Sequence, residues 1–165
     1  MRDPVGPEAG TPVADLRYEK HFIHQQGGFM NIDKFKHQHV EILASISALR
    51  TLAKNGIRAN AAEISSRIIA MSSLIKLHLA VEDSTLYPAL QSGDNALLAR
   101  LGKKYQSEME SIASAYLSFA RRWNAAAAVS RDPEGFRADA NHVLKMLHDR
   151  MRRENTDFYP AIEAH

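Results

Sequence analysis

The sequence predicts an all-α protein, an up-down-up-down four-helix bundle preceded by an N-terminal arm. Between residues 30 and 165, apolar residues recur every three or four positions in four segments, which is the spacing of one face of an α-helix. No segment alternates apolar and polar residues as a half-buried strand does. Because most connections between the four segments are short, consecutive helices are expected to lie antiparallel around one core.

Composition limits the function classes. The chain has 165 residues, 45% of them apolar, which suits one domain with a real core. Its net charge of +2 comes from interleaved basic and acidic residues, a pattern that favours a mixed surface over a nucleic-acid patch. The absence of cysteine excludes disulfides, iron–sulfur clusters and thiolate-bound zinc. We find no apolar run of membrane-spanning length and no apolar signal segment, so we expect a cytoplasmic protein with no membrane partner.

Residues 1–29 are expected to form the arm, which is only partly helical. This segment holds most of the early Pro and Gly residues and a short helical patch over residues 14–26. His21 and His24 lie in that patch with no carboxylate in register, so we expect them at the surface.

The first helix of the bundle is expected over residues 32–54. Asn31 is a good N-cap, and Asn55, which Gly follows, marks the C-terminal stop. His39 shares the apolar stripe of this helix, whereas His37 lies two residues away and therefore points about 200° away. His39 is thus a candidate metal ligand that faces the core.

The second helix is expected over residues 61–85, ending before Pro88. Its apolar stripe closes with His78 and Glu82, one turn apart on one face. Metal sites inside bundles take a nitrogen and an oxygen ligand from one helix by this spacing. A carboxylate on an apolar stripe is costly unless something neutralises it, which also indicates a metal.

The third helix is expected over residues 95–123, and its stripe turns polar only at Tyr105 and Glu108. Tyr105 and Met109, one turn apart, are expected to pack in the core. For Glu108 the pattern leaves three choices open: it faces the site, pairs with an arginine of the fourth helix, or lies in solvent.

The fourth helix is expected over residues 136–157, after a loop through residues 130–135, and it carries Glu154 on its stripe. One turn earlier, Arg150 stands where the second helix has His78. Arginine does not ligate metals, but it is a natural partner for a buried carboxylate.

The ends of the second and fourth helices repeat one line of sequence. The two copies read Glu82-Asp-Ser-Thr-Leu-Tyr-Pro-Ala-Leu90 and Glu154-Asn-Thr-Asp-Phe-Tyr-Pro-Ala-Ile162. Together with the inward His39, these motifs resemble the hemerythrin-like (HHE cation-binding) proteins over residues 31–163. That family holds a non-haem di-iron centre with five histidines and two bridging carboxylates, which binds O2 or serves in sensing or redox work. The resemblance implies that His39 and His78 bind one metal, with Glu82 and Glu154 as the bridging carboxylates.

The second metal of that family takes three histidines, and the matching positions here hold other residues: Tyr105, Met109 and Arg150. Three kinds of site therefore remain open. One is a single metal, zinc or iron, at His39, His78, Glu82 and Glu154. Another is a carboxylate-rich two-metal site that recruits Glu108 and Tyr105. The third is an empty site in which Arg150 pairs with the glutamates.

We therefore expect a metal-binding protein with one or two non-haem iron ions or zinc, acting in O2, NO or redox sensing or in metal binding. The alternative is a non-catalytic interaction or regulatory module whose metal site has degenerated. A phosphotransfer role is disfavoured because His39 and His78 are expected to face inward. No Ser/His/Asp constellation, nucleophile elbow or phosphate loop is visible, so a hydrolytic enzyme is disfavoured as well.

Overall fold

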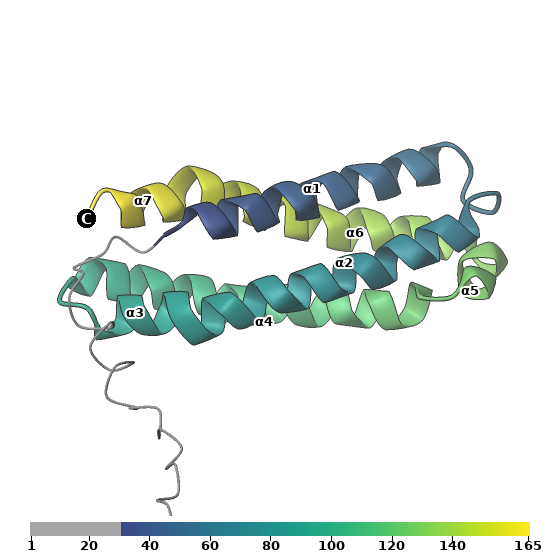
Figure 1. Cartoon of the computed structure of the whole chain (residues 1–165). Helices are drawn as coiled ribbons and strands as arrows, with labels where there is room; N and C mark the ends of the chain where they lie inside the picture. The colour runs from purple at the N-terminus through teal and green to yellow at the C-terminus, as the bar shows by residue number, and fades with distance from the viewer. Residues whose placement is uncertain (1–30) are drawn as a thin grey trace, which may run out of the picture.

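The computed structural model describes residues 31–165, and every regular element in this range is a helix. Four long helices run alongside one another (Figure 1); they are α1 (Asp33–Lys54), α2 (Ala61–Val81), α4 (Ala96–Trp123) and α6 (Pro133–Arg153). The all-α prediction is confirmed for this range. The predicted arm, with His21 and His24, lies outside the described residues.

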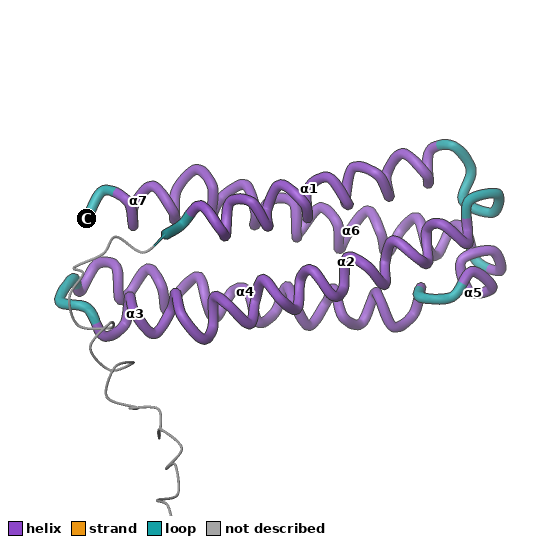
Figure 2. The backbone as a smooth tube through the Cα atoms, in the orientation of Figure 1, coloured by secondary structure: helices purple, strands orange, loops and turns teal. Residues whose placement is uncertain are grey.

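Side-chain oxygens accept backbone hydrogen bonds near the starts of α1, α4 and α6, and the loops lie at the ends of the molecule (Figure 2). Before α1, the side-chain oxygen of Asn31 accepts a hydrogen bond from the N–H of Asp33 at 3.0 Å. Asn95 caps α4 in the same way. Asp132 accepts from the N–H of Gly135 at 2.9 Å, so α6 begins at Pro133, three residues earlier than predicted. The loop predicted before it is partly helical, because the short α5 occupies Ala126–Arg131.

The second and fourth helices do not end before their prolines, contrary to the prediction for Pro88. Each passes through one π-helical turn into a further short helix. The segments are η1 (Glu82–Leu86) and α3 (Tyr87–Ser92), then η2 (Glu154–Phe158) and α7 (Tyr159–Glu163). Proline has no N–H for the regular bond to the residue four positions back. In the π-turn the N–H of Tyr87 bonds instead to the carbonyl of Glu82, five residues back, and the helix continues past the proline.

Two apolar clusters fill the interior of the described chain. The larger contains Ile42, Ile75, Leu147 and Met151 among others. The smaller contains Phe35, Leu86, Tyr105 and Phe158. The polar residues that are 0% exposed lie where the two clusters meet, so this polar group is enclosed by apolar side chains on both sides; its members are His39, His78, Glu82, Arg150 and Glu154.

The stretch Ala61–Ser92 is long and apolar enough to cross a membrane by length and composition alone, with a mean hydropathy of 1.4 in its most apolar window. The expectation that no segment has this length and composition was therefore wrong. A core helix of a bundle has the same properties, and in this stretch His78 and Glu82 are buried in the interior.

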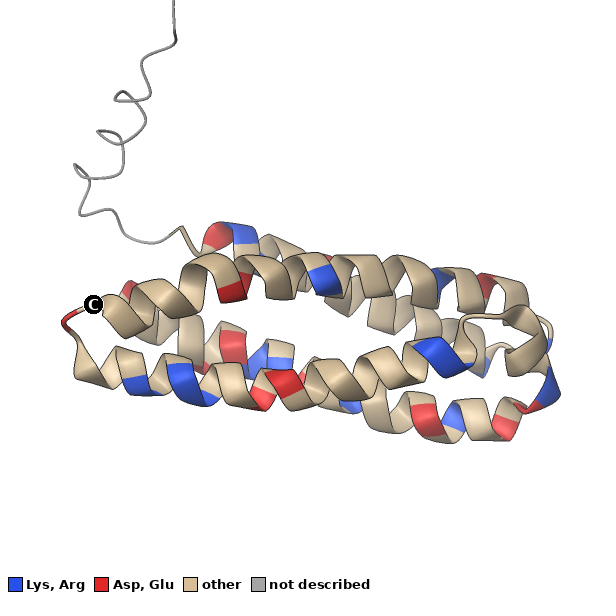
Figure 3. Ribbon diagram, turned by 90° about the horizontal axis from the view of Figure 1, so that it is seen from below, with Lys and Arg blue, Asp and Glu red and all other residues tan. Residues whose placement is uncertain are grey.

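Basic and acidic residues are interspersed along the helices in the view of Figure 3.

Candidate metal centre

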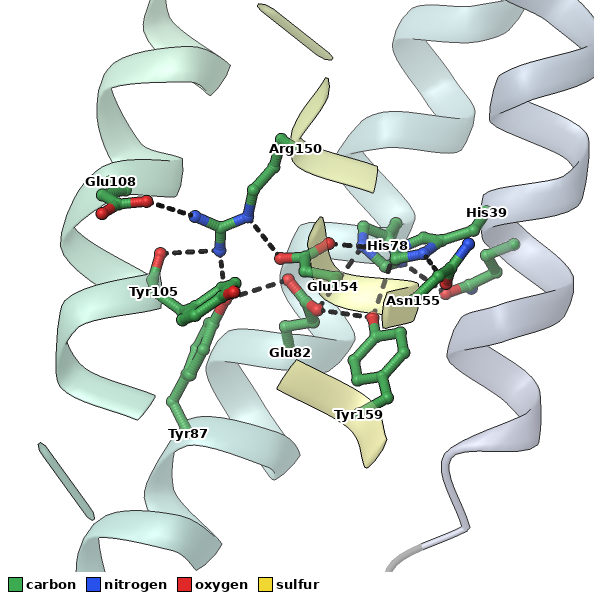
Figure 4. Close-up of polar contacts among 11 residues, drawn as sticks. His39, His78, Glu82, Tyr87, Tyr105, Glu108, Arg150, Glu154, Asn155 and Tyr159 are labelled. Atoms are coloured by element: carbon green, nitrogen blue, oxygen red, sulfur yellow. Dashed lines mark hydrogen bonds and ion pairs between the residues drawn. The ribbon is translucent and has the colours of Figure 1, made fainter. Parts of the chain in front are cut away.

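Four side chains from different parts of the chain converge inside the bundle. His39 comes from α1, His78 from α2, Glu82 from the start of η1 and Glu154 from the start of η2, and each is 0% exposed. One nitrogen or oxygen atom from each lies within 4.8 Å of the others (Figure 4). These are the four residues that the sequence pattern and the family resemblance selected as candidate metal ligands.

The separations between the donor atoms suit a single ion. His39 Nε2 lies 3.1 Å from His78 Nε2 and 3.2 Å from Glu154 Oε2. His78 Nε2 lies 3.5 Å from Glu82 Oε1. Neighbouring ligands that each lie about 2.1 Å from a metal are about 3.0–3.6 Å apart. These three separations fall in that range, and all four donor atoms lie within 4.8 Å of one another.

Two amide side chains orient the imidazole rings. Asn155 Oδ1 lies 2.8 Å from His39 Nδ1, and Gln38 Oε1 lies 3.0 Å from His78 Nδ1. An amide oxygen only accepts hydrogen bonds, so each Nδ1 carries a hydrogen, and in the neutral imidazole each Nε2 then has a free lone pair. Burial and the neighbouring His39 lower the pKa of His78 to about 4, so its second nitrogen stays unprotonated at neutral pH. Two lone pairs that face each other repel, and a cation between them removes the repulsion.

Glu154 supplies a further lone pair to the same place. Its Oε2 atom is the one buried side-chain oxygen or nitrogen of residues 31–165 that has no hydrogen-bond partner. The Arg150 guanidinium on its other oxygen lowers the pKa of this carboxyl against the opposing effect of burial. An ionised oxygen beside bare imidazole nitrogens fits a metal ion, which requires deprotonated ligands.

Two tyrosines hold the other carboxylate. Tyr87 donates to Glu82 Oε2 at 3.2 Å, and Tyr159 donates to Glu82 Oε1 at 3.0 Å. Burial and the charge of Glu82 raise the pKa of both phenols, so they stay protonated donors. Burial and the nearby Glu154 raise the pKa of Glu82 well above its usual range. Both causes disfavour the charged carboxylate, and a bound cation would offset them.

Arg150 closes the opposite side of the cluster. Its Nε donates to Glu154 Oε1 at 2.5 Å, and its Nη2 donates to the Tyr105 carbonyl at 2.7 Å and to the Tyr87 hydroxyl at 3.4 Å. The guanidinium carbon lies 4.5 Å from the centre of the Tyr105 ring. Glu154 therefore contacts a fixed cation through one oxygen and faces the bare nitrogens through the other.

Comparison with protein families matches the hemerythrin HHE cation binding domain over residues 30–162. The chain belongs to this family. The resemblance found in the sequence is thereby confirmed. Searches of curated proteins and of solved structures return no match. Within the hemerythrin family this chain has an atypical ligand set, because a buried phenol, thioether and guanidinium replace histidines; they belong to Tyr105, Met109 and Arg150.

Two residues weighed for a second metal lie apart from the four donors. Glu108 Oε2 is 3.4 Å from Arg150 Nη1 and 3.1 Å from Arg153 Nη2, and its side chain is 32% exposed. Figure 4 shows Glu108 on the far side of Arg150 from the histidines. Tyr105 contributes its ring and its carbonyl to Arg150. Of the three choices left open for Glu108, the structure places it in a pair with the arginine.

Sequence reasoning did not single out the amides and the tyrosines that support this hemerythrin site. Gln38 and Asn155 each stand next to a ligand candidate in the chain, but nothing in the sequence gives their rotamers. A signal for the tyrosines was present, because Tyr87 and Tyr159 occupy the same place in the two copies of the repeated line. The π-turns that bring them to the carboxylates were not predicted.

Proposed function

We propose that this hemerythrin-family domain binds one metal ion, non-haem iron or zinc, through His39, His78, Glu82 and Glu154. We propose further that it senses O2, NO or redox state. We also propose that its fold is an up-down-up-down four-helix bundle. The main observation that supports the metal site is the arrangement of the two histidines. Their Nε2 atoms face each other at 3.1 Å, and an amide oxygen at each Nδ1 keeps the facing nitrogens bare. Such partners of the ring nitrogen that stays off the metal are typical of metal-ligating histidines.

One ion, rather than two or none, agrees best with the placement of Arg150. The guanidinium already supplies a positive charge to Glu154 Oε1, where a second metal would bind the carboxylate. Glu108, the extra carboxylate needed by a two-metal site, lies on the outer side of that cation. An empty site leaves Glu154 Oε2 without a partner, because the arginine pairs with the other oxygen.

The chain's own residues would provide a metal site that excludes water and whose negative charge Arg150 partly neutralises. An iron ion bound there would supply redox chemistry and a coordination position for a diatomic molecule, since four protein donors do not complete the octahedral set that iron can take. Apolar clusters on both sides exclude water, and the ligands are fully buried. Tyr87 and Tyr159 hold Glu82 by both oxygens, so the carboxylate keeps its orientation.

Metal counting tests the binding proposal. Protein purified without chelator is loaded with Fe(II) under argon or with Zn(II), desalted, and measured by elemental analysis. We expect one ion per chain for the wild type and for His37→Ala, which removes an exposed histidine of α1, the helix that carries His39. His78→Ala should lose the ion. Two ions per chain, no ion, or an undiminished ion in His78→Ala would each contradict the proposal.

Spectroscopy tests the sensing role separately. The visible spectrum of the Fe(II)-loaded protein should change when NO or air is admitted. An unchanged, colourless sample that still holds its iron would contradict sensing and leave metal binding intact. The alternative, an interaction module with a degenerate site, predicts no thermal stabilisation by metal. A working site gains about 2.7 kcal/mol at a ligand concentration 100 times its Kd.

A further inference from the structure

The hydroxyl of Tyr159 lies among the proposed ligand atoms. It is 3.1 Å from His39 Nε2 and 3.0 Å from Glu82 Oε1, and the residue is fully buried. Its ring stacks on the His39 imidazole, with the ring centres 5.2 Å apart and the planes 27° apart. Figure 4 shows the hydroxyl directed at the space between Glu82 and the histidines.

Hydrogen counting shows that this hydroxyl presents a lone pair to His39. A phenol has one hydrogen, and Tyr159 donates it to Glu82 Oε1. Three polar atoms lie within 3.2 Å of His39 Nε2, and none of them offers it a hydrogen; they are His78 Nε2, Glu154 Oε2 and the Tyr159 hydroxyl oxygen. Four electron-rich atoms therefore share this space, and the phenol oxygen is one of them.

We infer that the phenol oxygen of Tyr159 is a fifth ligand of the bound ion and that it binds Fe(III) as a phenolate. The inference rests on the proposed metal site. The separations of the hydroxyl from His39 and Glu82 are the same as those among the four other donors. All of them fall in the range of about 3.0–3.6 Å expected for neighbouring ligands of one ion. The resulting set has two nitrogens and three oxygens.

The binding step balances without any change of oxidation state. An Fe(III)–oxygen bond forms, the phenol O–H bond breaks, and one proton passes to solvent for each ferric ion taken up. The three positive charges of the ion then meet three negative ones, from the phenolate, Glu82 and Glu154. Arg150 remains paired with the outer oxygen of Glu154. Oxygen ligands suit hard cations such as ferric iron.

Tyr87 is the matched control that the chain itself provides. It occupies the same place in the other copy of the repeated line, and it also donates to Glu82, through Oε2 at 3.2 Å. Its second polar neighbour is Arg150 Nη2 at 3.4 Å, whereas that of Tyr159 is His39 Nε2. Tyr87→Phe and Tyr159→Phe therefore delete equivalent hydroxyls, and only the second hydroxyl lies beside a histidine ligand.

The test loads wild type, Tyr87→Phe and Tyr159→Phe with Fe(III) from ferric citrate, then measures iron content and the visible spectrum. Phenolate bound to Fe(III) gives a charge-transfer band in the visible range, and excitation in that band enhances tyrosinate ring vibrations in the Raman spectrum. We expect the band and the vibrations in wild type and in Tyr87→Phe. Tyr159→Phe should lose both while it still binds iron.

Several outcomes would overturn the ligand assignment. They are iron-loaded wild type without the band, a band that persists in Tyr159→Phe, and equal loss of the band in both variants. Where Tyr159→Phe fails to fold, the tyrosinate vibrations of the wild type and their persistence in Tyr87→Phe still decide the assignment. Failure of the wild type to retain any iron would overturn the metal site as well, so the two proposals fail by different results.

Discussion

Replacing Arg150 with methionine removes the buried cation while keeping a long side chain. The guanidinium is 0% exposed and donates to Glu154 Oε1 at 2.5 Å and to the Tyr105 carbonyl at 2.7 Å. In Arg150→Met the carboxylate and the carbonyl both lose their buried partner. Breaking a buried ion pair from one side costs about 3–5 kcal/mol, because the remaining charge stays desolvated. We expect the metal-free variant to be less stable by that amount.

Thermal and urea unfolding of the metal-free proteins measure this loss. A change of 1 kcal/mol shifts the Tm of a chain of this size by about 2–4 °C, so Arg150→Met should melt about 6–20 °C lower. Arg153→Met is the matched control. Arg153 lies one turn away, is 47% exposed and contacts Glu108 at 3.1 Å. Its removal should cost no more than about 1 kcal/mol, as for other surface pairs.

The Tm shift on adding zinc provides a second measurement on Arg150→Met. In Arg150→Met, Glu154 has no cation other than the added metal, so saturating Zn(II) should raise the Tm of the variant more than it raises that of the wild type. A metal-free loss below about 1 kcal/mol would refute the view that Glu154 depends on Arg150. Equal zinc shifts in the two proteins would refute the view that the arginine and the metal share this carboxylate.

Three further outcomes are expected. Asn155→Leu removes the oxygen that orients His39, so zinc affinity in a chelator competition should fall about 10–100-fold, and unchanged affinity would contradict that role. Arg150→His exchanges the cation for a nitrogen ligand and should raise the iron count above one per chain; a count that stays at one would mean that the arginine does not exclude the second metal. Burial raises the pKa of Tyr116 to about 12, whereas the unfolded phenol ionises near 10, so stability should fall as the pH rises above about 10. Tyr116→Phe should flatten this decline in urea unfolding, and an equally steep decline would contradict the assignment to Tyr116.

The periodicity of apolar residues was sufficient to predict most of the fold. The apolar stripe identified His39 rather than His37 as the inward histidine of α1, and the structure buries the first and exposes the second. Capping residues placed the ends of α1 and the start of α4 within a residue or so. The prediction failed at Pro88, because a proline stops a regular helix but not one that widens by a residue just before it.

The candidate site was predictable only where a residue's role follows from its face on a helix. His78, Glu82 and Glu154 lie on apolar stripes, and the structure brings their ligand atoms together with that of His39. The roles of Gln38 and Asn155 depend on which way an amide points, and helix periodicity carries no information on that. The position of Glu108 relative to the histidines depends on how α4 packs against α6, because that packing puts Arg150 between them.

The π-turns explain how a tyrosine of the repeated line reaches a glutamate five residues earlier. In a regular α-helix, residues five apart point about 140° away from each other, so Tyr87 would not face Glu82. The wider turn brings residues five apart together, and the tyrosine can then donate to the glutamate. At the second copy, Glu154 is bound by Arg150 through one oxygen, and its other oxygen has no hydrogen-bond partner. Tyr159 donates across the core to Glu82 instead, which leaves its oxygen beside His39. The two copies of the line thus differ in their surroundings: Arg150 pairs with the second glutamate, whereas both tyrosines donate to the first.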